Sequence, residues 1–226
     1  MSKVPASIGI ILDGNRRWAK ENGLPSFEGH RRGFEKTKEI LEWADEAGIK
    51  EVVLYAFSTE NWNRSEEEVS YLMGIFKHAF GEYLEEVLRK GKQLRFIGQR
   101  DRLPADLQQL MNDAEEKSKS GDRGVVAIAL SYGGRPEILA AVNKLLAEGA
   151  KEVDEEQFRS AMWSAGLLDP DLIIRTGGEH RLSNFLTWQS VYSEFFFPTA
   201  KLPGFTREDF DAILAEYADR ERRHGK

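Results

Sequence analysis

The stretch from Ile8 to Trp18 joins an uninterrupted apolar run to a polar turn and the start of a helical pattern. Residues 8–12 carry no polar side chain, which is typical of a strand buried on both faces of a parallel sheet. An acid, a glycine, an amide and two arginines follow directly at positions 13–17. Such a strand needs a sheet that is covered on both faces, so this stretch constrains the fold more than any other.

The turn at positions 13–17 has the residues of an anion site. A strand, a polar turn and a helix in succession aim backbone N–H groups at an anion, with the positive end of the helix dipole behind them. The guanidinium of Arg17 suits phosphate oxygens, whereas Asp13 repels a phosphate unless a cation lies between them. The combination favours a diphosphate site with Mg²⁺ at the carboxyl end of the strand. The alternative is a surface turn with a salt bridge, and this stretch alone supports both interpretations equally.

Length and composition limit the class of protein. With 226 residues the chain can form one large domain or two small ones around a substantial core. No apolar run approaches the about 20 residues that a membrane span needs, and no signal-peptide pattern occurs. The absence of Cys excludes disulfides and thiolate metal sites, and we expect a cytoplasmic protein. A net charge of -6, from 38 acidic and 32 basic residues, argues against nucleic acid as a partner, so clustered arginines are informative.

Short apolar runs alternate with helical patterns along the chain. This alternation predicts an α/β fold with a central, mainly parallel six-stranded sheet flanked by helices, in a single domain that spans residues 1–226. Strands are predicted at 8–12, 51–57, 93–97, 125–130, 172–174 and 191–197. Helices are predicted at 18–21, 33–47, 69–90, 104–118 and 207–219, with another that begins at Pro136. Residues 23–30 and 58–68 are predicted to be loops.

Polar loops follow four of the predicted strands, those that end at residues 12, 57, 130 and 174. In open parallel sheets ligands bind beyond the carboxyl ends of the strands, so these loops share one rim. A glycine pair is more often a turn than a phosphate cradle, which makes each loop weak support by itself. Together they carry Arg17, Arg64, Arg175 and Arg181, and they favour an anion site over scattered salt bridges.

Five blocks of the sequence form a specific set of motifs: Asp13-Gly14-Asn15-x-Arg17-Trp18-Ala19, Gly29-His30-x-x-Gly33, Tyr55-Ala56-Phe57-Ser58-x-Glu60-Asn61-Trp62-x-Arg64, Tyr132-Gly133-Gly134-Arg135 and Ile174-Arg175-Thr176-Gly177-Gly178-Glu179-x-Arg181-x-Ser183-Asn184-Phe185-x-x-Trp188-Gln189. These blocks resemble the cis-prenyltransferases, whose best-known members are the undecaprenyl diphosphate synthases. The blocks occur in order and at compatible spacing from about Ile8 to the C-terminal tail. The resemblance therefore covers nearly the whole chain.

The resemblance implies a homodimer with one α/β domain per subunit and an apolar tunnel between the sheet and two helices. It implies Mg²⁺-dependent, sequential condensation of isopentenyl diphosphate onto an allylic diphosphate such as farnesyl diphosphate, with each new double bond cis. Loss of diphosphate from an allylic carbon leaves a carbocation, so metal and arginine must stabilise the charge on the leaving group. Whether product release needs a peripheral membrane contact is left open.

The resemblance also implies roles for individual residues. Asp13 matches a metal-linked acid, Glu194 a second acid associated with Mg²⁺, and His180 a further metal contact, although a lone His is more often structural. Asn61 matches the residue that assists removal of the C2 proton; an amide is a poor base, so the alternative is a diphosphate oxygen. The implied substrate-binding residues are Gly14, Asn15, Arg16, Arg17, Trp18, Ser26, His30, Ser58, Thr59, Glu60, Trp62, Arg64, Arg175, Arg181, Leu182 and Ser183, with Arg223 and Gly225 reaching across the dimer.

Some positions are ambiguous or depart from the family pattern. Apolar residues of the predicted helix 69–90 recur on one side, which fits a tunnel wall or plain core. Ser26 stands where an arginine is usual, and this puts substrate preference in doubt rather than the reaction class. The small Ala56, and the lack of an insertion after Val69, favour a short or medium product.

Three other functions are considered. A trans-prenyltransferase is all-helical and uses aspartate-rich motifs, and no adjacent Asp pair occurs here. A non-catalytic partner subunit of a heteromeric cis-prenyltransferase typically lacks the acid at position 13 and the phosphate arginines, which this chain keeps. A related short-chain, branched or cyclising condensing enzyme stays open because of Ser26, although the intact Asn61 and Arg64 argue against it.

Overall fold

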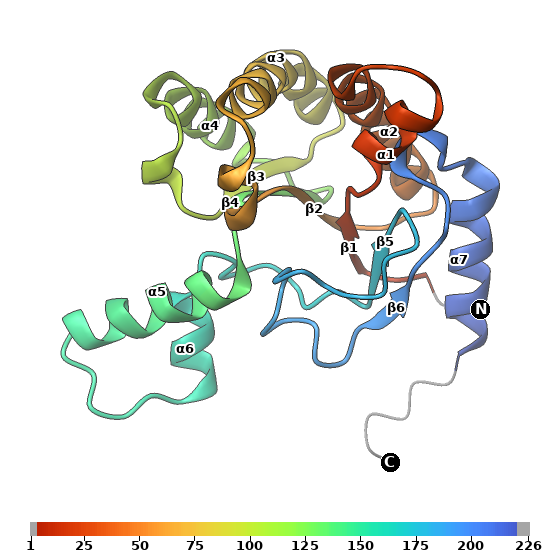
Figure 1. Cartoon of the computed structure of the whole chain (residues 1–226). Coiled ribbons are helices and arrows are strands. Elements are labelled where there is room, and N and C mark those ends of the chain that lie inside the picture. The colour runs from red at the N-terminus through yellow and green to blue at the C-terminus, as the bar shows by residue number, and fades with distance from the viewer. Residues whose placement is uncertain (1–3, 221–226) are drawn as a thin grey trace.

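A fully parallel six-stranded sheet runs through the centre of the molecule (Figure 1), and the computed structural model describes residues 4–220. The strand order is β3-β4-β2-β1-β5-β6, and all five pairings are parallel. The strands are β1 (Ser7–Ile11), β2 (Glu51–Ser58), β3 (Gln93–Ile97), β4 (Val125–Tyr132), β5 (Leu172–Arg175) and β6 (Glu194–Phe196). The predicted six-stranded α/β fold is confirmed, and the trans-prenyltransferase alternative is excluded because that class is all-helical.

Helices cover the sheet mainly on one face (Figure 1). They are α1 (Asn15–Glu21), α2 (Ser26–Glu46), α3 (Glu66–Arg89), α4 (Ala105–Ser118), α5 (Gly134–Ala147), α6 (Glu155–Ala161) and α7 (Arg207–Asp219), with short 3₁₀ turns η1 (Thr59–Asn63), η2 (Arg100–Arg102) and η3 (Leu202–Gly204). None of the helices in residues 4–220 combines the length and apolar character needed to cross a membrane.

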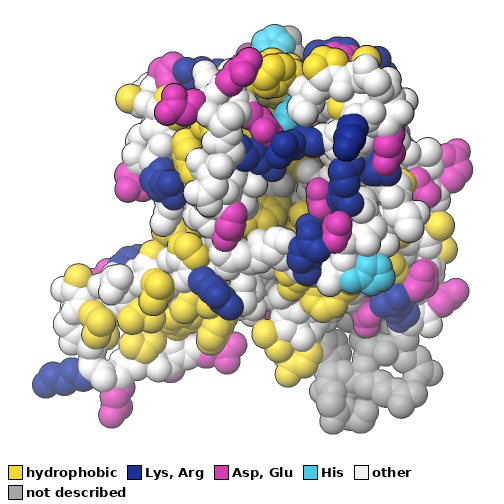
Figure 2. Space-filling model, viewed as in Figure 1, with side chains coloured by type: hydrophobic (Ala, Val, Ile, Leu, Met, Phe, Trp, Pro, Cys, Tyr) yellow, Lys and Arg dark blue, Asp and Glu magenta, His cyan; other side chains and the backbone are white. Residues whose placement is uncertain are grey.

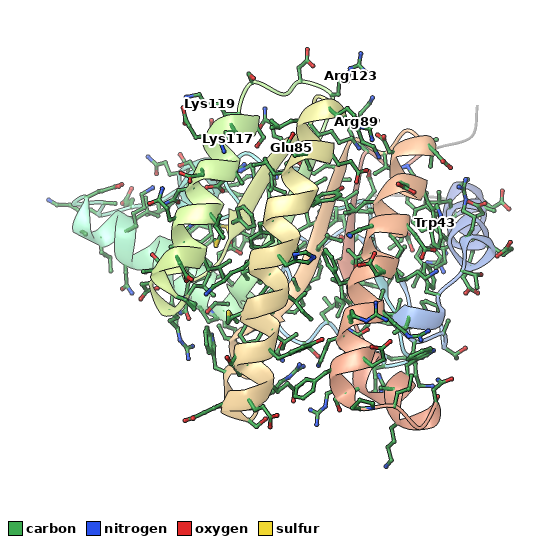
Figure 3. All side chains as sticks on the ribbon, turned by 90° about the horizontal axis from the view of Figure 1, so that it is seen from above. Trp43, Glu85, Arg89, Lys117, Lys119 and Arg123 are labelled. Atoms are coloured by element: carbon green, nitrogen blue, oxygen red, sulfur yellow. The ribbon has the colours of Figure 1, made fainter. Side chains whose placement is uncertain are left out.

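Alternation along the strands gives the sheet two apolar faces. Ile8 and Ile10 of β1 point toward α2, α3, α4 and α7 and join one buried cluster with residues of these helices. Ile11 and Tyr55 point to the opposite face and join a second buried cluster that contains Phe185. The first cluster places α2 and α3 side by side over the sheet (Figure 3), which is the arrangement that a tunnel between the sheet and two helices requires.

Several predicted boundaries were wrong for identifiable reasons. The loop predicted at 23–30 ends early, because the extended Pro25 caps a helix that already begins at Ser26. In the segment predicted as the loop 58–68, Ser58 caps η1, and Ser65 caps α3 by accepting a hydrogen bond from the Glu68 N–H. The helix α5 begins at Gly134 rather than at Pro136. The helix α6 was missed although Asp154 and Gln157 form a capping box, the usual signal of a helix start.

Candidate active site

A cavity of about 1190 Å³ lies between the sheet and helices α2 and α3. Its mouth is at the carboxyl ends of β1 and β2, where Figure 2 shows basic side chains around a hollow with apolar side chains inside it. The interior is lined from α2, α3 and the sheet by Phe34, Thr37, Leu72, Ile75, Phe76, Ala79, Phe80, Leu54 and Ile128. The cavity thus has a charged entrance and an apolar body.

One side of the mouth is built where β1 and β5 end next to each other. The Asp13 carboxylate accepts hydrogen bonds from Arg175 Nη2 at 2.9 Å and Nε at 3.3 Å, and Arg17 Nη2 lies 3.3 Å from the same Oδ2 atom. Arg175 is only 4% exposed, and it also donates to the Ser183 hydroxyl at 2.8 Å. Asp13, Arg17, Arg175 and Ser183 therefore form one buried to half-buried charged cluster, in which the carboxylate is flanked by two guanidinium groups.

Gly14 fixes the turn that carries Asp13. Its φ is 100°, in the left-handed region that favours glycine, and a Cβ atom there would lie 2.7 Å from Cβ of Lys201. The Gly14 N–H donates to the Asp13 Oδ1 atom at 2.6 Å. A side chain at position 14 would therefore strain the turn and move the carboxylate that it orients.

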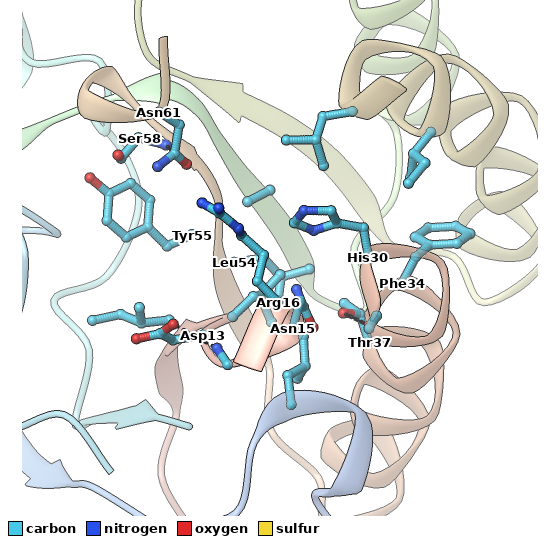
Figure 4. Close-up of a pocket in the computed structure, with 18 of the residues that line it drawn as sticks. Asp13, Asn15, Arg16, His30, Phe34, Thr37, Leu54, Tyr55, Ser58 and Asn61 are labelled. Atoms are coloured by element: carbon cyan, nitrogen blue, oxygen red, sulfur yellow. Dashed lines mark hydrogen bonds between the residues drawn. The ribbon is translucent and has the colours of Figure 1, made fainter. Parts of the chain in front are cut away.

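The other side of the mouth is organised by a carboxylate that was not predicted, Glu68. Its Oε1 atom lies 3.1 Å from His30 Nε2 and accepts a hydrogen bond from Arg64 Nη1 at 3.0 Å, while Arg16 Nη1 is 3.8 Å from Oε2. Burial is the main reason why the pKa of the His30 imidazole is lowered from its ordinary value, and it also lowers the pKa of Arg64. The His30 imidazole and two cations, Arg16 and Arg64, thus line the mouth on this side, and Figure 4 shows His30 and Arg16.

Asn61 lies in the short turn η1 at the same opening (Figure 4). Its Oδ1 atom accepts the backbone N–H of Ser58 at 3.1 Å in a capping box, which fixes the side chain. One of the two lone pairs of that oxygen is therefore engaged, and an amide is in any case a poor base.

The predicted site residues do not all reach the cavity. Those that line it are Asp13, Gly14, Asn15, Arg16, Arg17, Ser26, His30, Ser58, Glu60, Asn61, Arg64, Arg175 and Ser183. Trp18, Thr59, Trp62, Arg181 and Leu182 lie outside its lining: the indole of Trp18 lies under the Arg32 guanidinium, and Trp62 donates to the Ser131 hydroxyl. Arg223 and Gly225 lie outside the described residues.

Two further polar residues at the mouth were not predicted. Glu179 lies 3.2 Å from Arg17 Nη1 and pairs with Arg181, whose hydrogen bond lowers the pKa of the Glu179 carboxyl. Asn184 lines the cavity, and its amide donates to Glu60 and accepts the backbone N–H of Arg135. Both belong to the polar segment after β5, so the sequence did contain a signal for them.

The three predicted metal ligands are not brought together within the described part of the chain. Glu194 pairs with Leu172, the first residue of β5, whereas Asp13 contacts Arg175, the last one. This difference of three residues corresponds to about 10 Å along the sheet. Glu194 is bound instead to Arg220, and His180 stacks on Phe197. Among residues 4–220, no group of three or more His, Cys, Asp or Glu side chains could hold a metal ion.

Comparisons with known proteins agree with this architecture. The prenyltransferase family model, described as undecaprenyl diphosphate synthase, matches residues 11–225. An isoprenyl transferase from Thermotoga maritima is 44% identical over 227 residues, which cover 99% of this chain and 97% of that protein. An isoprenyl transferase from Rhizobium meliloti is 45% identical over 230 residues, which cover 99% of this chain and 93% of that protein.

Two solved structures share the fold. Lavandulyl diphosphate synthase from Lavandula x intermedia, in complex with dimethylallyl diphosphate, has a TM-score of 0.95 at 35% identity, with 99% of each chain covered. A probable undecaprenyl diphosphate synthase from Campylobacter jejuni has a TM-score of 0.83 at 32% identity, with 100% of each chain covered. The family model and the identities over nearly the full length show that the chain belongs to the undecaprenyl diphosphate synthase family of prenyltransferases.

Proposed function

We propose that this protein is a cis-prenyl diphosphate synthase that condenses isopentenyl diphosphate sequentially onto an allylic diphosphate such as farnesyl diphosphate. The observation that carries the proposal is the continuity of the cavity, whose charged mouth leads directly into an apolar body of about 1190 Å³. A molecule with a diphosphate at one end and a hydrocarbon chain at the other fits both parts. This volume exceeds the roughly 300–1,000 Å³ that is typical of small-molecule pockets, so a growing chain has room inside the protein.

Mg²⁺ fits the donor set at the mouth. Magnesium ions are usually held by one or two carboxylates together with substrate phosphates and water, rather than by an all-protein cage. Asp13 lines the cavity with 29% of its side chain exposed, so its carboxylate would hold the ion together with the diphosphate. When bound, the ion would neutralise negative charge on the diphosphate oxygens.

Different side chains of the mouth bind the diphosphates of the two substrates. Arg17 and Arg64 donate to the allylic diphosphate and stabilise the negative charge that develops as its C–O bond breaks. Arg175 and Ser183 hold isopentenyl diphosphate, whose double bond forms the new C–C bond with the allylic carbon. The C2 proton then leaves to restore a double bond. Since an amide is a poor base, we assign that proton to a diphosphate oxygen, and the hydrogen bond that fixes Asn61 to the Ser58 N–H suits a positioning role.

We also propose that the protein acts as a homodimer. Leu139 and Leu146 on α5, and Val191 and Tyr192 before β6, leave between 62% and 72% of their surface exposed, and Figure 2 shows apolar side chains gathered over α5 and α6. Large exposed apolar areas favour association with another protein surface. The helix α7 ends at Asp219, and the next residue, Arg220, donates to Glu194 and lies over the Phe196 ring of β6.

The dimer can be tested by charge substitution on this surface. We expect Leu139→Glu combined with Val191→Glu to convert the dimer into monomers, because each substitution places a carboxylate in a desolvated contact. Leu110→Glu, at an exposed leucine on α4, is the matched control and should stay dimeric. Sedimentation of the native protein as a monomer, or a dimer that survives both substitutions, would contradict the proposal.

A short-chain condensing enzyme is the second candidate function. It is favoured by the TM-score of 0.95 to lavandulyl diphosphate synthase, whose structure contains dimethylallyl diphosphate, and by Ser26 at the mouth. A five-carbon substrate would leave most of the cavity empty, so the volume of the cavity favours the longer chain.

The decisive experiment incubates the purified protein with Mg²⁺, labelled isopentenyl diphosphate and an allylic starter of five, ten or fifteen carbons. We expect products several units longer than the starter, new double bonds that are cis by NMR, and loss of all product when a chelator removes the metal. Incorporation of a single unit would favour the short-chain candidate. Absence of product from every starter would refute both candidates.

A further inference from the structure

The side chain of Asn15 is packed against a glycine of the neighbouring helix. If Gly33 of α2 carried a Cβ atom, that atom would lie 2.2 Å from Asn15 Oδ1, 2.7 Å from Cγ and 2.9 Å from Nδ2. Distances below 3.0 Å are essentially never seen for real Cβ atoms. The planar amide therefore lies directly on the bare backbone of α2, and any residue larger than glycine at position 33 would displace it.

The two ends of this amide have different surroundings. Asn15 Oδ1 is buried, and no hydrogen-bond partner for it exists among the residues that the structure describes. Nδ2 lies farther than Oδ1 from the Cβ position of Gly33, and it is not among the buried atoms that lack a partner. Asn15 lines the cavity, and Figure 4 shows it between Arg16 and Thr37. Burial of an acceptor without a partner is unfavourable, so each such atom in a native protein calls for an explanation, such as stored strain, a bound water or a functional role.

The orientation of the amide suits an anion in the mouth. With Oδ1 held against α2, the two N–H groups of Nδ2 are directed to the side where Arg16, Arg17 and Arg64 also line the cavity. In the reverse orientation the carbonyl oxygen would face a negatively charged ligand and repel it. The arrangement thus places donors, rather than an acceptor, next to the diphosphate.

Gly29, one turn earlier in α2, has a different role. A Cβ atom there would lie 2.2 Å from the backbone carbonyl oxygen of Asn15 and 3.0 Å from the Cβ atom of Ala19. Gly29 thus lets the backbone of α1 pack closely against α2, whereas Gly33 leaves room for the side chain of Asn15. Gly29 is therefore needed for the packing of two helices, and Gly33 for the orientation of a side chain at the cavity.

We propose that Gly33 is a positioning residue for diphosphate binding, and that it acts by holding the Asn15 amide with its two N–H groups toward the cavity. The inference rests on the proposed function, because it takes the anion at the mouth to be a diphosphate. The second glycine of Gly29-His30-x-x-Gly33 thus orients a ligand-binding side chain. The same contact explains why the Asn15 oxygen is buried without a partner.

The test measures binding of inorganic pyrophosphate to the full-length protein by calorimetry, without any requirement for turnover. Gly33→Ala should raise its Kd about tenfold to a hundredfold, the range for losing hydrogen bonds to a charged group. Gly81→Ala is the matched control, since it makes the same change in a helix where nothing lies within 4 Å of the new methyl group, and it should leave the Kd unchanged. Thermal melting checks that each variant is folded.

A double-mutant cycle tests whether Gly33→Ala weakens pyrophosphate binding through the Asn15 side chain. Asn15→Ala should weaken binding about as much as Gly33→Ala, and the double variant should bind no more weakly than Asn15→Ala alone, because both changes remove the same contact. Additive losses would overturn the proposal. So would native affinity of Gly33→Ala.

Asn15→Asp covers the case in which Gly33→Ala does not fold. It keeps the shape that fits on Gly33 but replaces the N–H donors by a negatively charged oxygen, so it should bind pyrophosphate more weakly than Asn15→Ala. Native affinity of Asn15→Asp would overturn the proposal. A native protein that binds pyrophosphate but makes no prenyl product would instead refute the proposed function and leave this inference in place.

Discussion

Replacing Asp13 by alanine is expected to lower turnover by several orders of magnitude in a protein that remains folded. Asp13 is the acid at the end of β1, and it is held by Arg175 at 2.9 Å, by Arg17 at 3.3 Å and by the Gly14 N–H. Without it, the site would lose the carboxylate that we expect to hold the ion on the diphosphate, and the negative charge on the leaving group would be less well stabilised.

The stability of this variant needs its own control. Arg175 is nearly buried, and removal of its carboxylate partner leaves a buried charge without compensation, which typically costs about 3–5 kcal/mol. Asp13→Asn keeps the shape of the side chain and one oxygen acceptor, so it should unfold at a higher temperature than Asp13→Ala and still lose most turnover. Single-turnover kinetics and thermal melting separate the two effects. A folded Asp13→Asn protein with near-native turnover would contradict the role of the acid.

Replacing Phe80 by alanine is expected to lengthen the product. The cavity is lined on α3 from Leu72 to Phe80, a rise of about 12 Å, and its lining on α2 ends at Thr37. Deeper side chains such as Leu84 are buried in the core and do not line it. Phe80 stacks on Phe76, and both line the cavity, while Phe96 packs against Phe80 from behind. Removal of one ring opens space in the direction in which the chain grows.

The matched control for Phe80→Ala lies on the same helix. Val87 is buried but does not line the cavity, so Val87→Ala should lower the free energy of unfolding without changing the product. Phe80→Ala itself should cost about 3–5 kcal/mol of stability, and Phe80→Leu offers a milder change in the same direction. Products are sized by reversed-phase chromatography after removal of the diphosphate. An unchanged product length in both folded Phe80 variants would show that another part of the cavity ends the chain.

The parts of the fold that follow from local patterns could be predicted from the sequence. The apolar run 8–12 and the polar segments after residues 12, 57, 130 and 174 indicated parallel strands whose loops meet at one rim. Asp13, Arg64 and Arg175 do line one cavity. This succeeded because the carboxyl ends of parallel strands share an edge, whatever the detailed packing.

Other parts of the site depend on contacts that no local pattern contains. Glu68 is the third of three consecutive glutamates, and the cap at Ser65 sets the helical phase that turns this one toward His30. Glu194 matched a metal ligand by resemblance, yet the register of β6 against β5 puts it near the opposite end of the sheet from Asp13. The contact between Asn15 and Gly33 brings together two helices that a turn separates. The homodimer, the role of the tail and the cytoplasmic location stay predictions.

The position of β1 between β2 and β5 has a consequence for how the chain is made. Residues 8–11 pair with residues 172–175, so β1 has only β2 beside it until more than 160 further residues have left the ribosome. At about 5–20 residues per second this takes roughly 8–30 s. During that time an apolar strand is the open edge of a partial sheet, the kind of surface that pairs with other chains. Chaperones are therefore expected to matter most before β5 appears, and Asp13 can meet Arg175 only after β5 has left the ribosome.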